Sequence, residues 1–133
     1  MRNTFTLGSL LVVLSACSRA TSAPFDVAPG QSIQLVEGQV ARVSNTTVAL
    51  QFVGANDSRC PSDVVCISAG EAVIALAFNG AGADRADTLT LVKKPNSTTY
   101  GGYLFEATDL LPYPKSQRTA PGKTLTVRVS KAP

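Results

Sequence analysis

Apolar and polar side chains alternate along most of the chain after residue 25, which is typical of half-buried β-strands. The alternation predicts strands at residues 32–36, 39–43, 46–53, 88–92, 103–110 and 124–129. Residues 71–79 are apolar at both odd and even positions, so we predict a central strand with both faces covered. No convincing helical period interrupts this pattern.

These seven short strands are separated by turns rich in Gly, Pro and Asn. They predict an all-β domain, either a single antiparallel β-sandwich or a small barrel. Residues 93–102 and 111–123 lack the strand pattern, so we expect them to be loops. Residues 79–87 have oxygen-bearing side chains without the spacing of a calcium loop, and we expect a hairpin connection there.

The chain begins with a different pattern. A basic start and an apolar run over residues 10–14 are followed by small residues just before Cys17. This layout is typical of a secretory signal peptide with its cleavage site. The run is interrupted by Ser9 and Ser15 and is shorter than the roughly 20 residues that a membrane-spanning helix needs.

Residues 14–17, Leu-Ser-Ala-Cys, resemble a bacterial lipobox. The resemblance implies that residues 1–16 are a lipoprotein signal peptide and that the sulfur of Cys17 receives a lipid. It places the protein in the cell envelope, on a membrane outside the cytoplasm. That membrane would be the outer one in a host with two, because Ser18 is not the retention residue Asp. An ordinary signal peptide with a chance cysteine is the alternative.

The same resemblance divides the chain into three parts: residues 1–16, the lipidated Cys17 with a short linker to residue 24, and a β-sandwich domain over 25–133. Residues 18–24 reach at most about 23–25 Å when extended, so the domain would be held close to the bilayer. The predicted partners are therefore a membrane, through the lipid, and an unidentified envelope protein.

The composition excludes several functions. The chain has no His and its only Met is the initiator, so we expect no metal and no cofactor. It has neither a nucleophile elbow nor a Ser-x-x-Lys motif, and we expect no catalytic residues and no enzyme activity. Carboxylates that meet only in the fold are the remaining catalytic alternative. Beyond residue 16 the chain has 11 Lys/Arg against 9 Asp/Glu, a net +2 that does not suggest nucleic-acid binding.

The chain has three cysteines. If Cys17 is attached to lipid, Cys60 and Cys66 remain as one pair, which oxidising conditions outside the cytoplasm would close. Five residues separate them, whereas two separate the cysteines of thioredoxin-like redox motifs. We therefore predict a structural disulfide that contributes roughly 2.4 kcal/mol in the chain-entropy account. A regulatory thiol pair is the alternative.

A second resemblance covers most of the chain after the signal. Residues 57–61 (Asp-Ser-Arg-Cys-Pro), Cys66 and residues 69–71 (Ala-Gly-Glu) resemble a pattern in uncharacterised small exported bacterial proteins and lipoproteins. Residues 110–114 (Leu-Leu-Pro-Tyr-Pro), placed before the last strand, resemble the same proteins. The resemblance implies a fold and no activity. Ser68 stands where those proteins often have an aromatic residue, which weakens any stacking role for this loop.

Two interpretations of residues 57–70 remain open. In the first, the segment is a structural corner in which Arg59 bonds Asp57, Asp63 or loop carbonyls, and Pro61 fixes the backbone. In the second, it is a recognition loop held by the disulfide, with Asp57, Arg59 and Pro61 as candidate binding residues and Arg59 as the anchor.

These observations favour a noncatalytic envelope lipoprotein with a binding or structural role. A small secreted inhibitor of hydrolases, such as proteases, is the second hypothesis. Its loops at residues 56–70, 93–102 and 111–123 would then enter the enzyme. An enzyme that uses carboxylates is a weaker third hypothesis.

Overall fold

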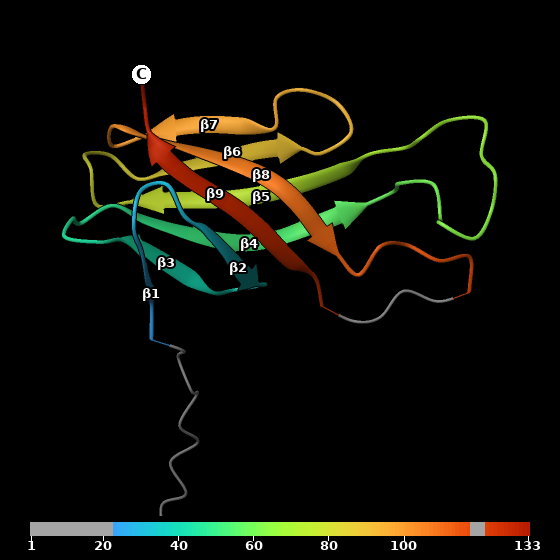
Figure 1. The fold of residues 1–133 in the computed structure, drawn as a ribbon, viewed down its shortest axis with the longest axis horizontal. Coiled ribbons are helices and arrows are strands. Elements are labelled where there is room, and N and C mark those ends of the chain that lie inside the picture. Colours follow the sequence, from blue (N-terminus) through green and yellow to red (C-terminus); the bar gives the residue numbers. More distant parts are fainter. Residues whose placement is uncertain (1–22, 118–121) are drawn as a thin grey trace, which may run out of the picture.

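In the computed structural model, residues 23–117 and 122–133 are described, and they form two β-sheets that pack face to face (Figure 1). The strands are β1 (Phe25–Val27), β2 (Ser32–Val36), β3 (Val40–Val43), β4 (Ala49–Asp57), β5 (Ala72–Asn79), β6 (Arg85–Thr90), β7 (Ser97–Tyr100), β8 (Tyr103–Leu111) and β9 (Thr124–Lys131). Within these two ranges no helix is long and apolar enough to cross a membrane. The predicted signal peptide and Cys17 lie outside the described residues.

The first sheet has the strand order β1-β3-β4-β5-β6, and the second has the order β2-β9-β8-β7. Two separate sheets confirm the predicted all-β sandwich and not the small barrel. One pairing departs from the antiparallel prediction, because β1 runs parallel to β3. The chain passes through β2 in the opposite sheet between these two strands, and such a crossover permits a parallel pair.

The sandwich has nine strands where the sequence predicted about seven. The additional strands, β1 and β7, are short and lie at sheet edges. β7 falls inside the predicted loop 93–102, and its sequence Ser-Thr-Thr-Tyr has one aromatic residue and no aliphatic alternation. Its buried residue, Tyr100, stacks on Phe78 with the ring centres 5.3 Å apart. Pairing with β8 and the contact of Tyr100 with the core, rather than an alternating sequence, therefore account for this strand.

One face of β5 enters the core, and the other faces outward. Ile74, Leu76 and Phe78 are buried, while Val73 is exposed and Ala75 is half-buried. The prediction that both faces of this strand are covered is therefore wrong for the described chain. The outward positions hold mostly small side chains, and their exposure leaves little apolar area in water.

β4 is longer than predicted and positions the most distinctive part of the molecule. A β-bulge between Phe52 and Gly54 shifts its pairing with β5. The bulge breaks the period of two, which is why the strand pattern stops at residue 53 in the sequence. Beyond the bulge the two strands stay paired to Asp57 and Ala72. Residues 58–71 connect them at this end of the sandwich.

Candidate functional site

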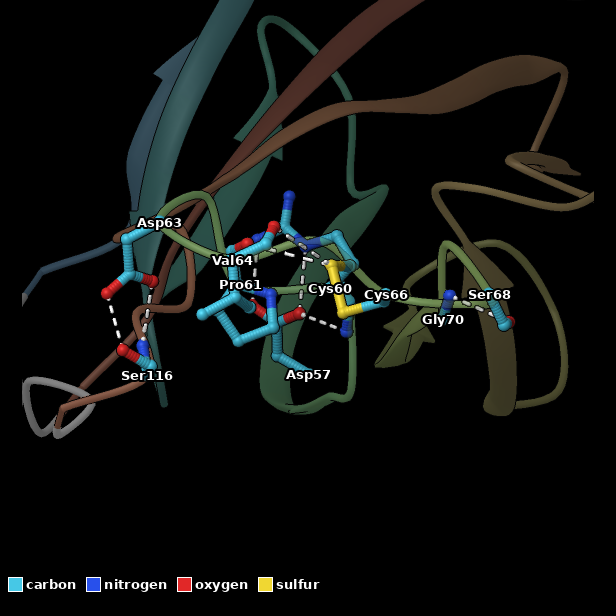
Figure 2. Close-up of a disulfide and its surroundings, with 10 residues drawn as sticks. Asp57, Cys60, Pro61, Asp63, Val64, Cys66, Ser68, Gly70 and Ser116 are labelled. Carbon is cyan, nitrogen blue, oxygen red and sulfur yellow. Dashed lines mark hydrogen bonds and ion pairs between the residues drawn. A yellow bond between two sulfur atoms is a disulfide. The ribbon is translucent and has the colours of Figure 1, made fainter.

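Residues 58–71 form a long loop beyond the ends of β4 and β5, on the right of Figure 1. We refer to these residues as the disulfide loop. Its base continues the β4–β5 ladder, since the backbone N–H of Ser58 donates to the carbonyl of Glu71 at 2.8 Å. The N–H of Cys60 donates to the carbonyl of Ala69, also at 2.8 Å. Cys60 is bonded to Cys66, which confirms the predicted disulfide (Figure 2).

Gly70 lets the two arms of the loop base come close together. Its φ is +68°, and a Cβ atom at this position would lie 2.0 Å from the carbonyl oxygen of Ser58. Only glycine combines this backbone conformation with such an approach. The backbone N–H of Gly70 donates to Oγ of Ser68 at 3.3 Å, on the same side of the loop (Figure 2).

Three charged side chains form an ion cluster at the root of the disulfide loop. Arg59 donates from Nε to Oδ1 of Asp57 at 2.8 Å and from Nη2 to Oδ2 at 2.7 Å. Lys123 donates from Nζ to the same Oδ2 at 2.7 Å. No more than 9% of any of these three side chains is exposed. Little water reaches them, so each charge depends on its partners for compensation.

The ion cluster joins the two sheets at this end of the sandwich. Asp57 ends β4 in the first sheet, and Lys123 comes just before β9 in the second. Nη2 of Arg59 also donates to the carbonyl of Leu110 in β8, at 2.7 Å. Nζ of Lys123 donates to the carbonyl of Pro112 at 2.9 Å. The cluster therefore holds the root of the loop against the second sheet.

Arg59 occupies the position that the structural-corner interpretation predicted. Its guanidinium bonds Asp57 and a carbonyl, but not Asp63. The ring of Tyr113 covers it, with the ring centre 4.1 Å from the guanidinium carbon. Arg59 is buried, so it offers a partner almost no surface in this conformation. Pro61, the third candidate recognition residue, is half-buried beside the disulfide.

The segment that follows β8 lies along the disulfide loop. The backbone N–H of Ser62 donates to the carbonyl of Pro114 at 3.0 Å. Asp63 accepts hydrogen bonds from the backbone N–H and the hydroxyl of Ser116, at 2.9 and 2.5 Å (Figure 2). Residues 57–71 and 110–117 therefore form one structural unit, which includes the two separate parts of the resemblance, in 57–71 and at 110–114.

Two carboxylates of this unit, Asp57 and Asp63, are held in their ionised form. Burial alone would raise the pKa of Asp57, but hydrogen bonds from Arg59 and Lys123 outweigh it and lower that pKa to about 2. The hydrogen bond to Asp57 in turn raises the pKa of Arg59 above its usual value. Hydrogen bonds from Ser116 lower the pKa of Asp63. At neutral pH these two carboxylates are weak bases.

Every residue of the outer part of the disulfide loop, residues 62–69, is exposed. Three of its residues are apolar: Val64, Val65 and Ile67, exposed at 45%, 101% and 110% of their reference areas. We refer to these three residues as the apolar tip. The only charged residue between positions 60 and 70 is Asp63. The tip is therefore an apolar surface at the far end of the loop.

Sequence reasoning missed two features of this site. Lys123 lies 66 positions from Asp57 along the chain, and no sequence spacing signals that contact. The apolar tip does have a signal, because its residues flank Cys66 within a segment of turn-forming residues that has no alternating period. An apolar run closed by a disulfide and outside any strand is a candidate for exposure.

Comparison with known protein families, with curated proteins and with solved structures found no match. Among residues 23–117 and 122–133, no three His, Cys, Asp or Glu side chains gather as metal ligands. The function is therefore inferred from this chain's own residues.

Proposed function

We propose that this protein is a noncatalytic lipoprotein of the bacterial cell envelope, anchored through a lipid on Cys17, whose β-sandwich presents the disulfide loop to a partner protein. The lipobox-like residues 14–17 support the anchor. The short linker over residues 18–24 supports a domain held near the bilayer. The apolar tip is the observation that supports a binding role.

The apolar tip differs from ordinary surface residues in two ways. Single exposed apolar side chains are common on protein surfaces, whereas here three lie within four positions of one loop. The loop beneath them is also fixed by the disulfide, by the close approach at Gly70 and by the ion cluster. A segment that is ordered before binding loses little conformational entropy on binding.

The state of the carboxylates supports a noncatalytic role at this site. Asp57 forms ion pairs with two buried cations, and Asp63 accepts two hydrogen bonds from Ser116. A general acid or base at neutral pH needs a pKa near 7, but the pKa of both carboxylates is lowered. These two residues favour a binding role over the carboxylate-based enzyme.

An inhibitor of a hydrolase is the second candidate function, and the shape of the disulfide loop favours it. The loop extends past the ends of the strands that carry it (Figure 1). A convex, ordered loop suits a concave enzyme cleft. The two candidates differ in outcome, because an inhibitor stops the activity of its partner and a binding module leaves it intact.

A pull-down from envelope extracts tests the proposal. The wild-type protein should retain a discrete partner, and the double variant Val65→Asp/Ile67→Asp should lose it. Val92→Asp is the matched control, since Val92 is an exposed apolar residue outside the loop. Equal retention by all three proteins would contradict binding through the tip. Assaying the captured protein for hydrolase activity, with and without the domain, separates the two candidates.

A further inference from the structure

Val65 and Ile67 are the most exposed large apolar residues in the described chain. They lie on either side of Cys66, whose bond to Cys60 closes the loop beneath them. Burial of both side chains by a partner would remove two aliphatic surfaces from water, which is favourable. Their position at the end of an ordered loop makes them accessible to a concave surface.

The main chain at the tip makes few hydrogen bonds to the described residues, although the N–H of Val64 donates to the carbonyl of Pro61 at 3.3 Å. Within residues 23–117 and 122–133, the backbone N–H groups of Val65, Cys66 and Ile67 donate to no acceptor. At the base of the same loop, by contrast, the N–H groups of Ser58 and Cys60 are bonded across the ladder. N–H groups that no residue of the described chain accepts from are available to a partner, and in peptide recognition such main-chain bonds give affinity while pockets give specificity.

The unpaired N–H groups of residues 65–67 argue against a lipid bilayer as the surface that contacts the tip. An unpaired N–H is costly in hydrocarbon, where no water can bond it. Anionic headgroups attract basic residues, but the single charged residue between positions 60 and 70 is the acidic Asp63. A protein cleft with its own main-chain acceptors satisfies both the apolar side chains and the N–H groups.

The place of the loop in the fold also favours a partner away from the anchoring membrane. Phe25 pairs with Ala41, which pairs with Leu50 in β4. Asp57, at the root of the loop, lies about 20 Å further along the same strand. The start of β1 and the disulfide loop accordingly lie toward opposite ends of the molecule in Figure 1.

We infer that the apolar tip occupies a peptide-binding cleft of a second exported protein. Apolar pockets of that cleft receive Val65 and Ile67, while its main chain accepts hydrogen bonds from residues 65–67. This inference rests on the proposed binding function. In this inference the residues that contact the partner are those of the tip and not Arg59, which is buried.

Site-specific photo-crosslinking in the host tests this inference on the full-length protein. A photoreactive phenylalanine derivative is placed at position 67, with position 25 as the control, because Phe25 is an exposed aromatic residue near the other end of the domain. Position 67 should give one discrete protein adduct, and position 25 should not. Val65→Asp in the same chain should reduce the adduct from position 67 at least tenfold. Peptides of the partner recovered in the adduct should line an apolar cleft.

Four results would overturn the inference. Adducts with lipid alone at position 67 would assign the tip to the membrane. A protein adduct that survives Val65→Asp would show that the pockets play no part. Adducts from position 25 and none from position 67 would exclude the tip and would leave a binding role only for another surface of the domain. If neither position gives a protein adduct, both the inference and the proposed function are contradicted.

Discussion

Arg59 forms a bidentate ion pair with Asp57, in which Nε and Nη2 donate to the two carboxylate oxygens at 2.8 and 2.7 Å. This geometry matches the planar fork of a guanidinium to the plane of a carboxylate, which is among the strongest protein hydrogen-bond arrangements. Because both side chains are almost completely buried, the pair is a structural element of the loop root. The binding role that we propose falls to the apolar tip, which the pair helps to position.

The pKa of Asp57 predicts an acid-sensitive contribution to stability. That pKa is about 2 in the folded protein, against 3.8 for the ordinary side chain, so folding favours the ionised form. The contribution, about 2 kcal/mol, is present above about pH 4 and is lost as the pH falls toward 2. Urea unfolding at pH 6 and pH 2 should therefore show a larger loss for wild type than for Asp57→Asn. Equal losses would contradict the assignment.

Removal of the disulfide should weaken the domain without unfolding it. Cys60→Ser/Cys66→Ser should lower the melting temperature by about 5–10 °C, because the closed loop is small and the core lies elsewhere. Circular dichroism should still report a β-sheet protein. Mass spectrometry of wild type under non-reducing conditions should show the two residues joined. Free thiols at both positions in protein isolated from the envelope would favour the redox alternative.

Gly70 and Gly38 offer a matched pair for testing the close approach at the loop base. Both have positive φ, but a Cβ atom meets the carbonyl of Ser58 only at Gly70 and meets nothing within 4 Å at Gly38. Gly38→Ala should cost about 1 kcal/mol for backbone strain alone. Gly70→Ala should cost about 2–4 kcal/mol, since the clash adds to the strain. Equal costs from chemical denaturation would mean that the loop base opens easily.

We predict that the protein is attached to a membrane through Cys17. Wild-type protein should fractionate with membranes, and its mature mass should include acyl chains on residue 17, whose buried methylenes each contribute roughly 0.8 kcal/mol. Cys17→Ser should remain an uncleaved precursor or become soluble. Wild-type protein recovered without acyl chains, entirely in the soluble fraction, would refute the lipid anchor.

The features that could be predicted from the sequence are those determined by residues close together in the chain. The alternation over residues 32–36 and 124–129 identified two strands. In a half-buried strand the side chains that face the core are apolar and those that face water are polar, so the strand is visible in its own sequence. The disulfide followed from cysteine parity. β7 escaped prediction because its neighbours, not its sequence, make it a strand.

The candidate site was partly predictable for the same reason. Asp57 and Arg59 are two residues apart, so their contact was one of the alternatives that the sequence allowed. Lys123 joins them only through the packing of the two sheets. The exposure of Val65 and Ile67 depends on how the loop is placed relative to the two sheets, and no local sequence pattern predicts that placement.

The central claim is that the loop root is structural and the apolar tip is reserved for binding. The thermal unfolding midpoint of the purified domain, compared between Arg59→Ala and Ile67→Asp, tests this claim most directly. Arg59→Ala removes two hydrogen bonds to Asp57 and one to the carbonyl of Leu110, all of them almost completely buried, and should lower the midpoint by at least about 10 °C. Ile67→Asp changes a fully exposed side chain and should shift the midpoint by no more than about 2 °C. An unchanged midpoint for Arg59→Ala, or a large drop for Ile67→Asp, would contradict this division of roles.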